Sequence, residues 1–300
     1  MNSVFEVIGG IAGVAVRENE LLSGHTTFGV GGPCDLMVWV STKQALQEVL
    51  VLAKDEGLPF FILGRGSNIL VRDGGIPGIV VRLVDEFART EVCGTEVEAG
   101  GGASLGEVVS KATSAGIGGL EFLAGIPGTV GGAAVSNAGA KDDWLSDRLT
   151  RLAVIDGGLK YRDLRPKQVG FGYRTSGIGP DWIVTDAVLR GHSATVEEAR
   201  QQVEVYLERR RRTQPIGEHS AGCVFKNPPG DYAGRLIDAV GLKGAAAGKA
   251  QVSPIHANFI VNAGGATAKE IMDLIERIRE RVREAHGIDL DLEINIVGKD

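Results

Sequence analysis

Two glycine-rich segments of this chain have a backbone that could bind a phosphate group. One is LGRGSNIL, residues 63–70, and the other is GIPGTVGGAAVSNAGA, residues 125–140. Glycine lets the backbone approach a ligand closely, and successive amides in such turns form a nest for an anion. Neither segment is a Walker A loop, and strand-like residues instead of a helix follow the first one. A tight β-turn is the alternative for the first segment, and close Gly/Ala packing is the alternative for the second.

A third segment, AGCVFKNPPG at residues 221–230, places a thiol in a turn that is rich in glycine and proline. Free cysteine is most often a small buried apolar residue. A thiol can also donate a proton, because its ordinary pKa is near 8.5. The three cysteines, Cys34, Cys93 and Cys223, are widely spaced and predict neither a disulfide framework nor a metal site. They fit a reducing compartment.

Composition and charge exclude several classes of protein. The 300 residues carry a formal net charge of −6, which gives the chain as a whole no affinity for nucleic acid. Its basic run, ERRRRTQP at 208–215, is either a solvated helix end or an anion contact. We find no apolar run of membrane-spanning length and no signal-peptide pattern, so we expect a cytoplasmic protein.

Apolar periodicity and capping signals predict the elements that must position these segments. Helices are expected at 41–57, 104–116, 195–212, 231–241 and 267–287, and three of them begin with a capping box. Strands are expected at 58–63, twice within 68–83, at 91–99, 151–156, 182–190 and 257–262. We predict an α+β chain with a domain boundary near 191–215, where the helix at 195–212 would act as a connector.

Seven motifs occur in order along the chain and together carry a resemblance to a known family. They are HTTFGVGG (25–32), LGRGSNIL (63–70), GLEFLAGIPGTVGGAAVSNAGA (119–140), FGYRTS (171–176), SAGCVFKNP (220–228), VSPIHANFIVN (252–262) and LEINIVG (292–298). The chain resembles the UDP-N-acetylenolpyruvoylglucosamine reductases from about residue 20 to 298. It is similar to the shorter branch of that family, which lacks an inserted tyrosine-bearing loop.

The resemblance implies an α+β fold with a two-part FAD-binding module of the vanillyl-alcohol-oxidase type and a smaller α/β substrate-binding domain. It implies FAD-binding subdomain 1 at 1–84 plus 289–300, subdomain 2 at 85–191, and a connector helix with the substrate domain at 192–288. The implied cofactor-binding residues are Gly64, Arg65, Gly66, Ser67, Asn68, Ile69, Gly125, Ile126, Pro127, Gly128, Thr129, Gly131, Gly132, Asn137 and Gly139.

The implied activity is NADPH-dependent reduction of UDP-N-acetylglucosamine enolpyruvate to UDP-N-acetylmuramate through FAD, in bacterial peptidoglycan precursor synthesis. We expect a cytoplasmic monomer with no nucleic-acid, membrane or metal partner. The alternative is an FAD-dependent oxidase of a small alcohol or sugar on the same fold.

Three catalytic residues are implied by the resemblance. Arg174 would stabilise the negative charge that develops in the substrate, because a guanidinium matches a carboxylate. Glu293 would help to hold or polarise that carboxylate, although a solvated strand face is its alternative reading. Cys223 stands where many relatives have a serine that donates the proton to C2.

The implied substrate-binding residues are Tyr173, Lys226, Asn227, Arg235 and His256. The chain departs from the family pattern at Thr213, Ala245 and Ala246, where cationic or aromatic residues are usual. We expect Lys243, Lys249 or the arginines at 209–212 to replace the lost diphosphate contacts.

Overall fold

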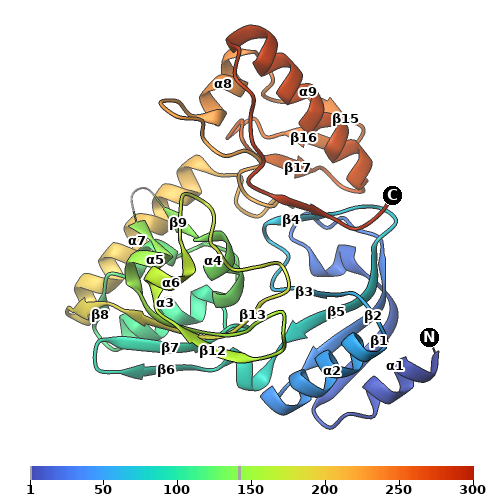
Figure 1. The fold of residues 1–300 in the computed structure, drawn as a ribbon. Coiled ribbons are helices and arrows are strands. Elements are labelled where there is room, and N and C mark those ends of the chain that lie inside the picture. Colours follow the sequence, from blue (N-terminus) through green and yellow to red (C-terminus); the bar gives the residue numbers. More distant parts are fainter. Residues whose placement is uncertain (1, 141–142) are drawn as a thin grey trace. The chain divides into compact units, whose positions relative to one another are not determined.

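The computed structural model describes residues 2–140 and 143–300 of the chain (Figure 1). Its longer helices are α1 (Asn2–Gly9), α2 (Lys43–Asp55), α3 (Leu105–Ser114), α7 (Val196–Thr213) and α9 (Ala268–His286). The shorter ones are α4 (Val130–Ser136), α5 (Leu145–Arg148), α6 (Pro166–Val169) and α8 (Ala233–Ala239), with 3-10 turns η1 (Leu22–His25), η2 (Asp85–Ala88) and η3 (Glu121–Leu123).

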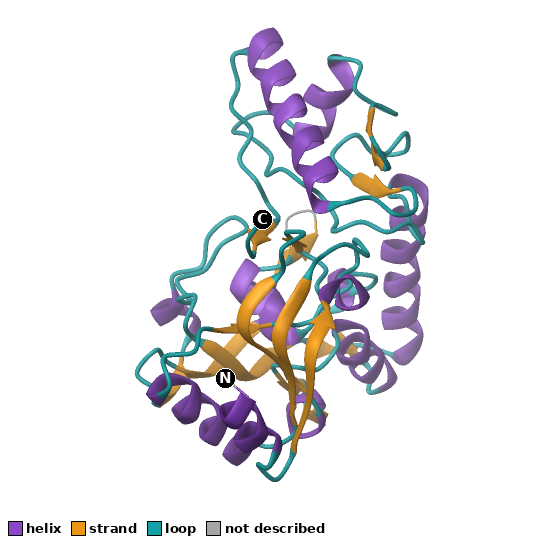
Figure 2. Ribbon diagram, turned by 90° about the vertical axis from the view of Figure 1, so that its right-hand side faces the viewer, coloured by secondary structure: helices purple, strands orange, loops and turns teal. Residues whose placement is uncertain are grey.

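The strands form two larger sheets and several small ones. A four-stranded sheet has the order β1 (Val14–Leu21), β2 (Pro33–Val40), β5 (Ile76–Leu83) and β3 (Phe60–Ile62). An antiparallel five-stranded sheet has the order β12 (Tyr161–Leu164), β11 (Leu149–Ile155), β13 (Ile183–Arg190), β7 (Glu96–Gly100) and β6 (Thr90–Cys93). The twist of these strands is visible in Figure 2, where they are orange.

The smaller sheets hold the remaining strands. Three strands form the sheet β15 (Ala246–Ala247), β16 (Ala250–Val252) and β17 (Ile260–Asn262). The pairs are β10 (Asp143–Trp144) with β9 (Gly139–Ala140), β14 (His192–Ser193) with β8 (Ile117–Gly118), and β18 (Asn295–Val297) with β4 (Ile69–Val71). The last pair is parallel and joins the C-terminal strand to the residues that follow the first glycine-rich segment.

The chain divides into two compact units. Unit 1 comprises Met1–Arg17, Leu36–Gly64 and Gly78–Arg209, and unit 2 comprises Glu18–Asp35, Arg65–Pro77 and Arg210–Asp300. The three-part division that the family resemblance implies, with its boundaries at 84, 191 and 288, stays a prediction.

Unit 1 contains two separate hydrophobic cores. One gathers the apolar face of α2, including Leu46, Val49 and Leu50, with inward residues of β2 and β5. The other gathers α3, α4 and the five-stranded sheet, with Val108, Val130 and other fully buried apolar side chains. Burial of apolar surface of this extent is the main stabilising contribution in each layer.

Unit 2 has one core under its longest helix. The predicted apolar stripe of α9, with Ile271, Leu274, Ile275, Ile278 and Val282, is buried throughout. α9 packs along the sheet of β15, β16 and β17, and α8 packs beside it (Figures 1 and 2). The sequence prediction of this helix and of its buried face is therefore confirmed.

Capping boxes begin α7 and α9 as predicted, and a side-chain cap from Ser104 begins α3. Thr195 and Glu198 bond each other's backbone N–H groups at the start of α7, and Thr267 and Glu270 do so at the start of α9. Ser104 accepts a hydrogen bond from the Glu107 amide at the start of α3. These bonds satisfy N–H groups that a helix leaves without an internal partner.

Two strand predictions need correction. The single strand expected at 91–99 is a hairpin, β6 and β7, which turns at Gly94 with φ +60°. Strand β3, expected to be buried, is only half-buried because it lies at a sheet edge. The two strands expected within 68–83 are confirmed as β4 and β5, and they belong to different sheets, because β4 pairs with β18 and β5 pairs with β3.

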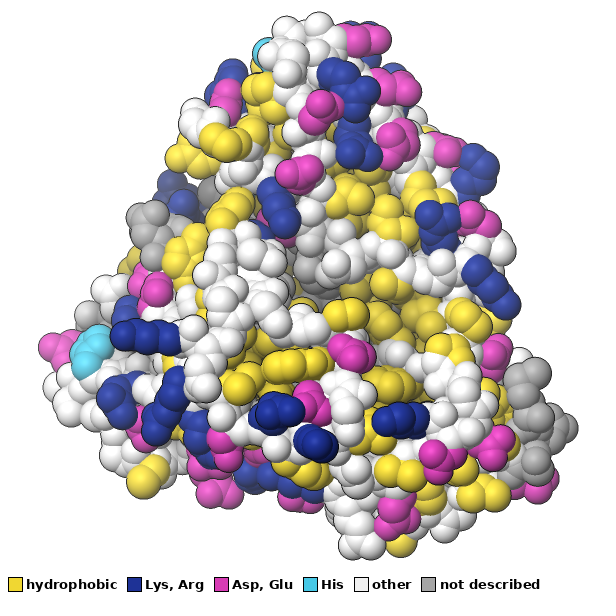
Figure 3. Space-filling view, viewed as in Figure 1, with side chains coloured by type: hydrophobic (Ala, Val, Ile, Leu, Met, Phe, Trp, Pro, Cys, Tyr) yellow, Lys and Arg dark blue, Asp and Glu magenta, His cyan; other side chains and the backbone are white. Residues whose placement is uncertain are grey.

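Charged side chains are interspersed on the face that Figure 3 shows, with Lys and Arg in dark blue and Asp and Glu in magenta. Mixed charges of this kind are usual for a protein surface and do not form the continuous basic stripe that nucleic-acid binding uses. Among the described residues, no helix is both long enough and apolar enough to cross a membrane.

Candidate active site

The start of the first glycine-rich segment, at Gly64, meets the second segment within unit 1. A Cβ on Gly64 would lie 2.7 Å from Oγ1 of Thr129, so only glycine permits this approach. The Arg82 guanidinium donates a hydrogen bond to the Gly64 carbonyl at 2.9 Å and holds this part of the loop. Residues more than 60 positions apart therefore form one surface.

The second segment leads into α4 and leaves part of its surface without side chains. Thr129 caps the helix by accepting a hydrogen bond from the Gly132 amide at 3.3 Å. A Cβ on Gly131 would lie 2.9 Å from the Gly101 carbonyl, so packing explains that glycine. A Cβ on Gly132 would meet only Thr129 Oγ1, at an ordinary 3.5 Å, and Gly132 is exposed. Since protein packing gives Gly132 no reason to be glycine, the segment fits close approach by a large ligand such as FAD.

Asn137 and Gly139, at the end of that segment, bind the protein itself. The Asn137 side chain is 3% exposed, donates to the Gly172 carbonyl at 2.9 Å and accepts from the Ser146 amide at 3.0 Å. A Cβ on Gly139 would lie 2.5 Å from the Trp144 ring. These contacts give both residues a packing role, and their cofactor role stays a prediction.

Arg174 lies at the tip of a four-residue turn in unit 1. The turn is closed by a hydrogen bond from the Gly172 amide to the Thr175 carbonyl at 3.0 Å. Arg174 has φ +53°, in the left-handed region that non-glycine residues seldom adopt. Its guanidinium carbon lies 5.3 Å from the centre of the Trp144 ring. The neighbouring Tyr173 is exposed and meets the same ring edge-on at 5.5 Å.

Cys223 and Glu293 come together within unit 2. The segment around Cys223 forms an isolated antiparallel bridge from Cys223 to Phe259 on one side. On the other side, the Glu293 amide donates to the carbonyl of Val224 at 2.8 Å. The two candidate catalytic residues are thus one residue out of register on neighbouring segments. Both side chains are half-buried.

Glu293 lies in a bend just before β18, although the alternating pattern of its segment suggests a strand. The first glycine-rich segment lies beside it, because Nδ2 of Asn68 donates to the Glu293 carbonyl at 3.2 Å. The Asn295 amide in turn donates to the Asn68 carbonyl at 3.0 Å. Unit 2 therefore places the predicted cofactor residue Asn68 next to a predicted catalytic residue.

Three more predicted cofactor residues of the first segment, Arg65, Gly66 and Ser67, lie directly before Asn68. Gly66 is buried, has φ +64°, and a Cβ there would lie 2.3 Å from the His25 carbonyl. Its carbonyl accepts a hydrogen bond from the Thr27 amide at 3.0 Å. Arg65 is exposed and Ser67 is half-buried. The HTTFGVGG motif therefore packs against the first glycine-rich segment at Gly66 and hydrogen-bonds to it.

Asn258, in the VSPIHANFIVN motif, is a buried positioning residue. Its side chain is 3% exposed, accepts from the Phe225 amide at 2.9 Å and donates to the Phe225 carbonyl at 2.8 Å. Its own carbonyl accepts from the Val224 amide at 2.8 Å. Asn258 thus acts like an added strand residue that fixes the chain directly after Cys223.

The predicted substrate-binding residues of unit 2 lie around the start of α8. Oδ1 of exposed Asn227 accepts from the Ala233 amide at 3.1 Å, and Arg235 pairs with Asp231. That pairing lowers the pKa of Asp231 to about 2. Lys226 donates its backbone amide to the Asp291 carbonyl at 2.8 Å, which fixes its position in the chain.

His256 completes this group. Burial lowers the pKa of His256 below its ordinary value, which favours the neutral ring. Its Nδ1 accepts a hydrogen bond from the Asn258 amide at 3.2 Å, so the ring proton is on Nε2. The ring lies over Gly234, where a Cβ would approach it to 3.2 Å. His256 can therefore act as a neutral hydrogen-bond donor.

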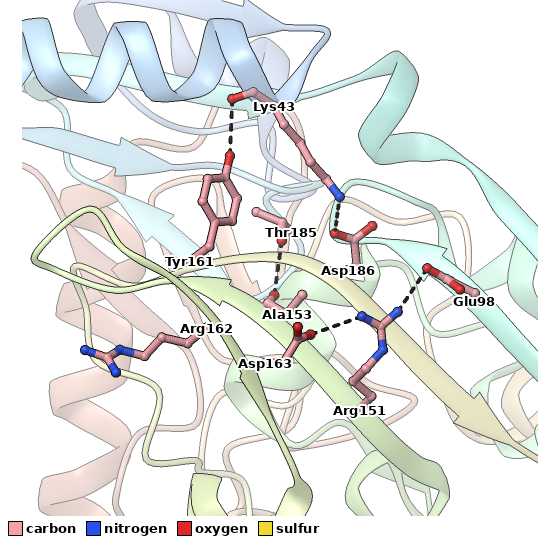
Figure 4. A pocket seen from close by; sticks show the side chains of 9 residues that line it. All are labelled: Lys43, Glu98, Arg151, Ala153, Tyr161, Arg162, Asp163, Thr185 and Asp186. Carbon is pink, nitrogen blue, oxygen red and sulfur yellow. Dashed lines mark hydrogen bonds and ion pairs between the residues drawn. The ribbon is translucent and has the colours of Figure 1, made fainter.

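A separate pocket of about 210 Å³ in unit 1 contains no predicted site residue. In Figure 4, Lys43 bonds Asp186 at 3.0 Å, and Arg151 bonds Glu98 and Asp163. Arg162, which also lines the pocket, pairs with Asp156. Asp186 is buried and also bonds Arg89 at 2.6 Å. Because these charged residues form ion pairs with one another, we interpret the pocket as a network of ion pairs that links α2 to the five-stranded sheet. In the described part of the chain, no cluster of three or more His, Cys, Asp or Glu residues could hold a metal ion.

Comparison with known proteins identifies the class of this chain. Residues 34–160 match the family described as FAD binding domain, and residues 214–297 match UDP-N-acetylenolpyruvoylglucosamine reductase, C-terminal domain. The second match contains both Cys223 and Glu293. Together with the α+β architecture, these matches define a flavin-dependent oxidoreductase and confirm the expected fold class.

Full-length relatives make the family specific. The chain is 45% identical over 287 residues to UDP-N-acetylenolpyruvoylglucosamine reductase 2 of Symbiobacterium thermophilum, covering 94% of this chain and 92% of that protein. It is 39% identical to the reductase of Bacillus subtilis, with 94% of each chain covered. A crystal structure of the reductase from Thermus caldophilus superimposes with a TM-score of 0.83 at 39% identity, covering 95% of this chain and 99% of that one. This chain belongs to the UDP-N-acetylenolpyruvoylglucosamine reductase family.

Replacing Asn258 by alanine should destabilise the protein by about 2–5 kcal/mol, because the Phe225 amide and carbonyl would remain buried without partners. Urea unfolding of the flavin-loaded protein measures this difference. Asn295→Ala, at an exposed side chain, is the matched control and should change stability by less than about 0.5 kcal/mol. Equal stability of the two variants would contradict the positioning role.

The thiols of Cys34 and Cys93 should differ in reactivity. Cys34 is buried, and burial raises the pKa of its thiol to about 11, so it stays protonated at pH 8. Cys93 is exposed. Iodoacetamide at pH 8, followed by peptide mass spectrometry, should modify Cys93 first and Cys34 only after unfolding, since the thiolate is the reactive form. Modification of Cys34 in the folded protein at the rate of Cys93 would show that this thiol is accessible and ionised.

Proposed function

We propose that this chain reduces UDP-N-acetylglucosamine enolpyruvate to UDP-N-acetylmuramate, with NADPH as the electron source, in peptidoglycan precursor synthesis. The observation that carries the proposal is the pairing of the Cys223 and Glu293 segments inside the region that matches the reductase C-terminal domain. Relatives of nearly equal length carry the reductase name.

The residues of unit 1 fit the FAD that this reaction needs. Exposed Gly125, Pro127 and Gly132 leave the second glycine-rich segment open to a pyrophosphate, and the close approach of Gly64 to Thr129 fixes the start of the first segment. In unit 2, Arg65, Ser67 and Asn68 are the further polar residues that we propose for FAD. When bound, FAD would carry two electrons from NADPH and supply them as hydride to C3 of the enolpyruvyl group.

Arg174 binds the carboxylate of the enolpyruvyl group. Addition at C3 leaves negative charge at C2 that spreads into this carboxylate, and a guanidinium can hold both carboxylate oxygens. A group oriented before the reaction stabilises this charge better than mobile water does. Glu293 holds or polarises the same carboxylate from the neighbourhood of Cys223.

Cys223 donates the proton to C2. A thiol is a much stronger acid than the serine hydroxyl found in many relatives, since its ordinary pKa is near 8.5. It therefore needs less help from its surroundings to protonate an enolate-like carbon. The hydrogen bonds of Asn258 and Glu293 fix the backbone on the C-terminal side of Cys223, at Val224 and Phe225.

Tyr173, Lys226, Asn227, Arg235 and His256 are proposed to hold the sugar nucleotide. Arg235 is already paired with Asp231, so diphosphate binding through it would require that ion pair to rearrange. Neutral His256 offers an Nε2–H donor without an added charge. Because the substrate is a nucleotide sugar and the reductant is NADPH, we place the reaction in the bacterial cytoplasm. We also propose that a monomer performs it.

The activity should separate into two half-reactions in the absence of oxygen. NADPH should bleach the flavin absorbance of the purified protein, and UDP-N-acetylglucosamine enolpyruvate should restore it with formation of UDP-N-acetylmuramate. Stopped-flow absorbance and mass spectrometry of the product measure both steps. In an FAD-dependent oxidase, an alcohol or sugar would instead bleach the flavin absorbance and oxygen would restore it. That behaviour would refute the proposal.

Cys223→Ala should lose most of the second half-reaction, by about 100-fold or more, because general-acid catalysis contributes this much. Cys223→Ser should retain substantial turnover, since a hydroxyl can still carry the proton. NADPH-driven bleaching should be unchanged in both variants, and Cys93→Ala, at an exposed thiol, should behave as wild type. Near-normal flavin reoxidation by Cys223→Ala would eliminate Cys223 as the proton donor.

A further inference from the structure

We propose that Trp144 is a positioning residue that holds the Arg174 guanidinium in the orientation required by the substrate carboxylate. This inference rests on the proposed function. It concerns a residue outside the motifs that carry the family resemblance, and it depends on contacts within unit 1 alone.

Arg174 needs external support because of where it lies. It occupies a turn tip with a backbone conformation that is unfavourable for a side chain with a Cβ, and such conformations persist only when neighbouring contacts enforce them. An arginine side chain has many rotamers, and ordering it costs entropy. A guanidinium that must meet a carboxylate in a planar, two-point contact therefore benefits from a surface that limits its motion.

The Trp144 ring provides that surface. The guanidinium carbon lies 5.3 Å from the ring centre, within the range of a cation–π interaction, and tryptophan is the best aromatic partner for a cation. A ring face attracts the cation without occupying any of its N–H donors. Tyr173 meets the ring edge-on at 5.5 Å and 89°, so both residues at the turn tip contact the same indole.

Trp144 is itself held in place by its surroundings. Its backbone pairs with Gly139 in the β9–β10 ladder, and its ring occupies the space that a Gly139 Cβ would fill. Its amide donates to the Asp147 carboxylate at 3.2 Å. The adjacent Asp143 carboxylate accepts from Arg148 and from the Tyr206 hydroxyl, each at 3.2 Å. Trp144 is therefore held by contacts that do not involve Arg174.

One buried amide connects the Trp144 segment to the turn. The Asn137 side chain accepts a hydrogen bond from the amide of Ser146, which lies in α5 two residues after Trp144. It donates a hydrogen bond to the Gly172 carbonyl at the base of the turn. The Ser176 hydroxyl donates to the Val135 carbonyl at 2.8 Å and holds the far side of the turn. Hydrogen bonds from the α4 and α5 regions to the turn thus fix the position of the guanidinium relative to the ring, in addition to the indole contact itself.

The test compares Trp144→Phe with Trp144→Leu in the flavin-loaded enzyme. Trp144→Leu should raise the KM for UDP-N-acetylglucosamine enolpyruvate and slow flavin reoxidation by about 5- to 20-fold, the range expected for a cation–π contact. Trp144→Phe keeps an aromatic face and should remain within about threefold of wild type. The rate of flavin reduction at saturating NADPH should stay within about twofold in both. Trp182→Leu, which removes an indole that packs on the core of unit 1, controls for loss of a tryptophan.

A double-mutant cycle separates positioning from general structure. The dissociation constant of the enolpyruvyl nucleotide for the oxidised enzyme is titrated through the flavin spectrum in wild type, Trp144→Leu, Arg174→Ala and the double variant. Trp144→Leu should weaken binding about 10-fold when Arg174 is present and less than about twofold when it is absent, because the two residues act through one contact.

Two results would refute the role of Trp144 but leave the proposed function intact. One is an equal KM and reoxidation rate in Trp144→Leu and Trp144→Phe. The other is a loss of nucleotide binding on Trp144→Leu that is as large without Arg174 as with it. A wild-type enzyme that neither binds the nucleotide nor is reoxidised by it would refute the proposed function as well. The two failures are therefore distinguished by the wild-type titration.

Discussion

Backbone amides and carbonyls in irregular segments must find hydrogen-bond partners, and this constraint shapes both parts of the chain that bear the proposed catalytic groups. Neither Arg174 nor Cys223 lies inside a helix or a strand of a larger sheet. A buried asparagine amide bonds each of the two segments: Asn137 bonds Gly172, and Asn258 bonds both polar backbone groups of Phe225. An asparagine side chain offers the same donor and acceptor as a peptide group, so it can replace a missing strand.

This arrangement gives each unit its own local support for chemistry. In unit 1 the support acts on a cation, and a ring face supplements the hydrogen bonds without adding a counter-ion that would compete for the guanidinium. In unit 2 it acts on the segments that carry a thiol and a carboxyl side chain, which are joined by backbone bonds through Val224. A group that stabilises developing charge works best when its orientation is fixed before the reaction.

The sequence predicted the helices best, because their signals are local. The capping boxes at Thr195 and Thr267 and the apolar stripe of α9 lie within a few residues of what they determine. The turn of the β6–β7 hairpin at Gly94 was missed. The pairing of β4 with β18 could not be predicted, since it joins residues far apart in the chain. The roles of Trp144 and Asn258 could not be predicted for the same reason: their partners are about 30 residues away, and no spacing rule connects them.

The glycines of the two predicted phosphate-binding segments show why a motif alone cannot separate packing from ligand binding. Gly64, Gly66, Gly131 and Gly139 each face protein atoms that would lie within 3.0 Å of an added Cβ. Only internal close packing is needed to explain them. Gly132 differs, because an added Cβ there would meet an ordinary contact and its surface is open. Of these four, Gly64 faces the other segment, at Thr129. A backbone fixed by close packing allows an open position such as Gly132 to present its amide to a cofactor.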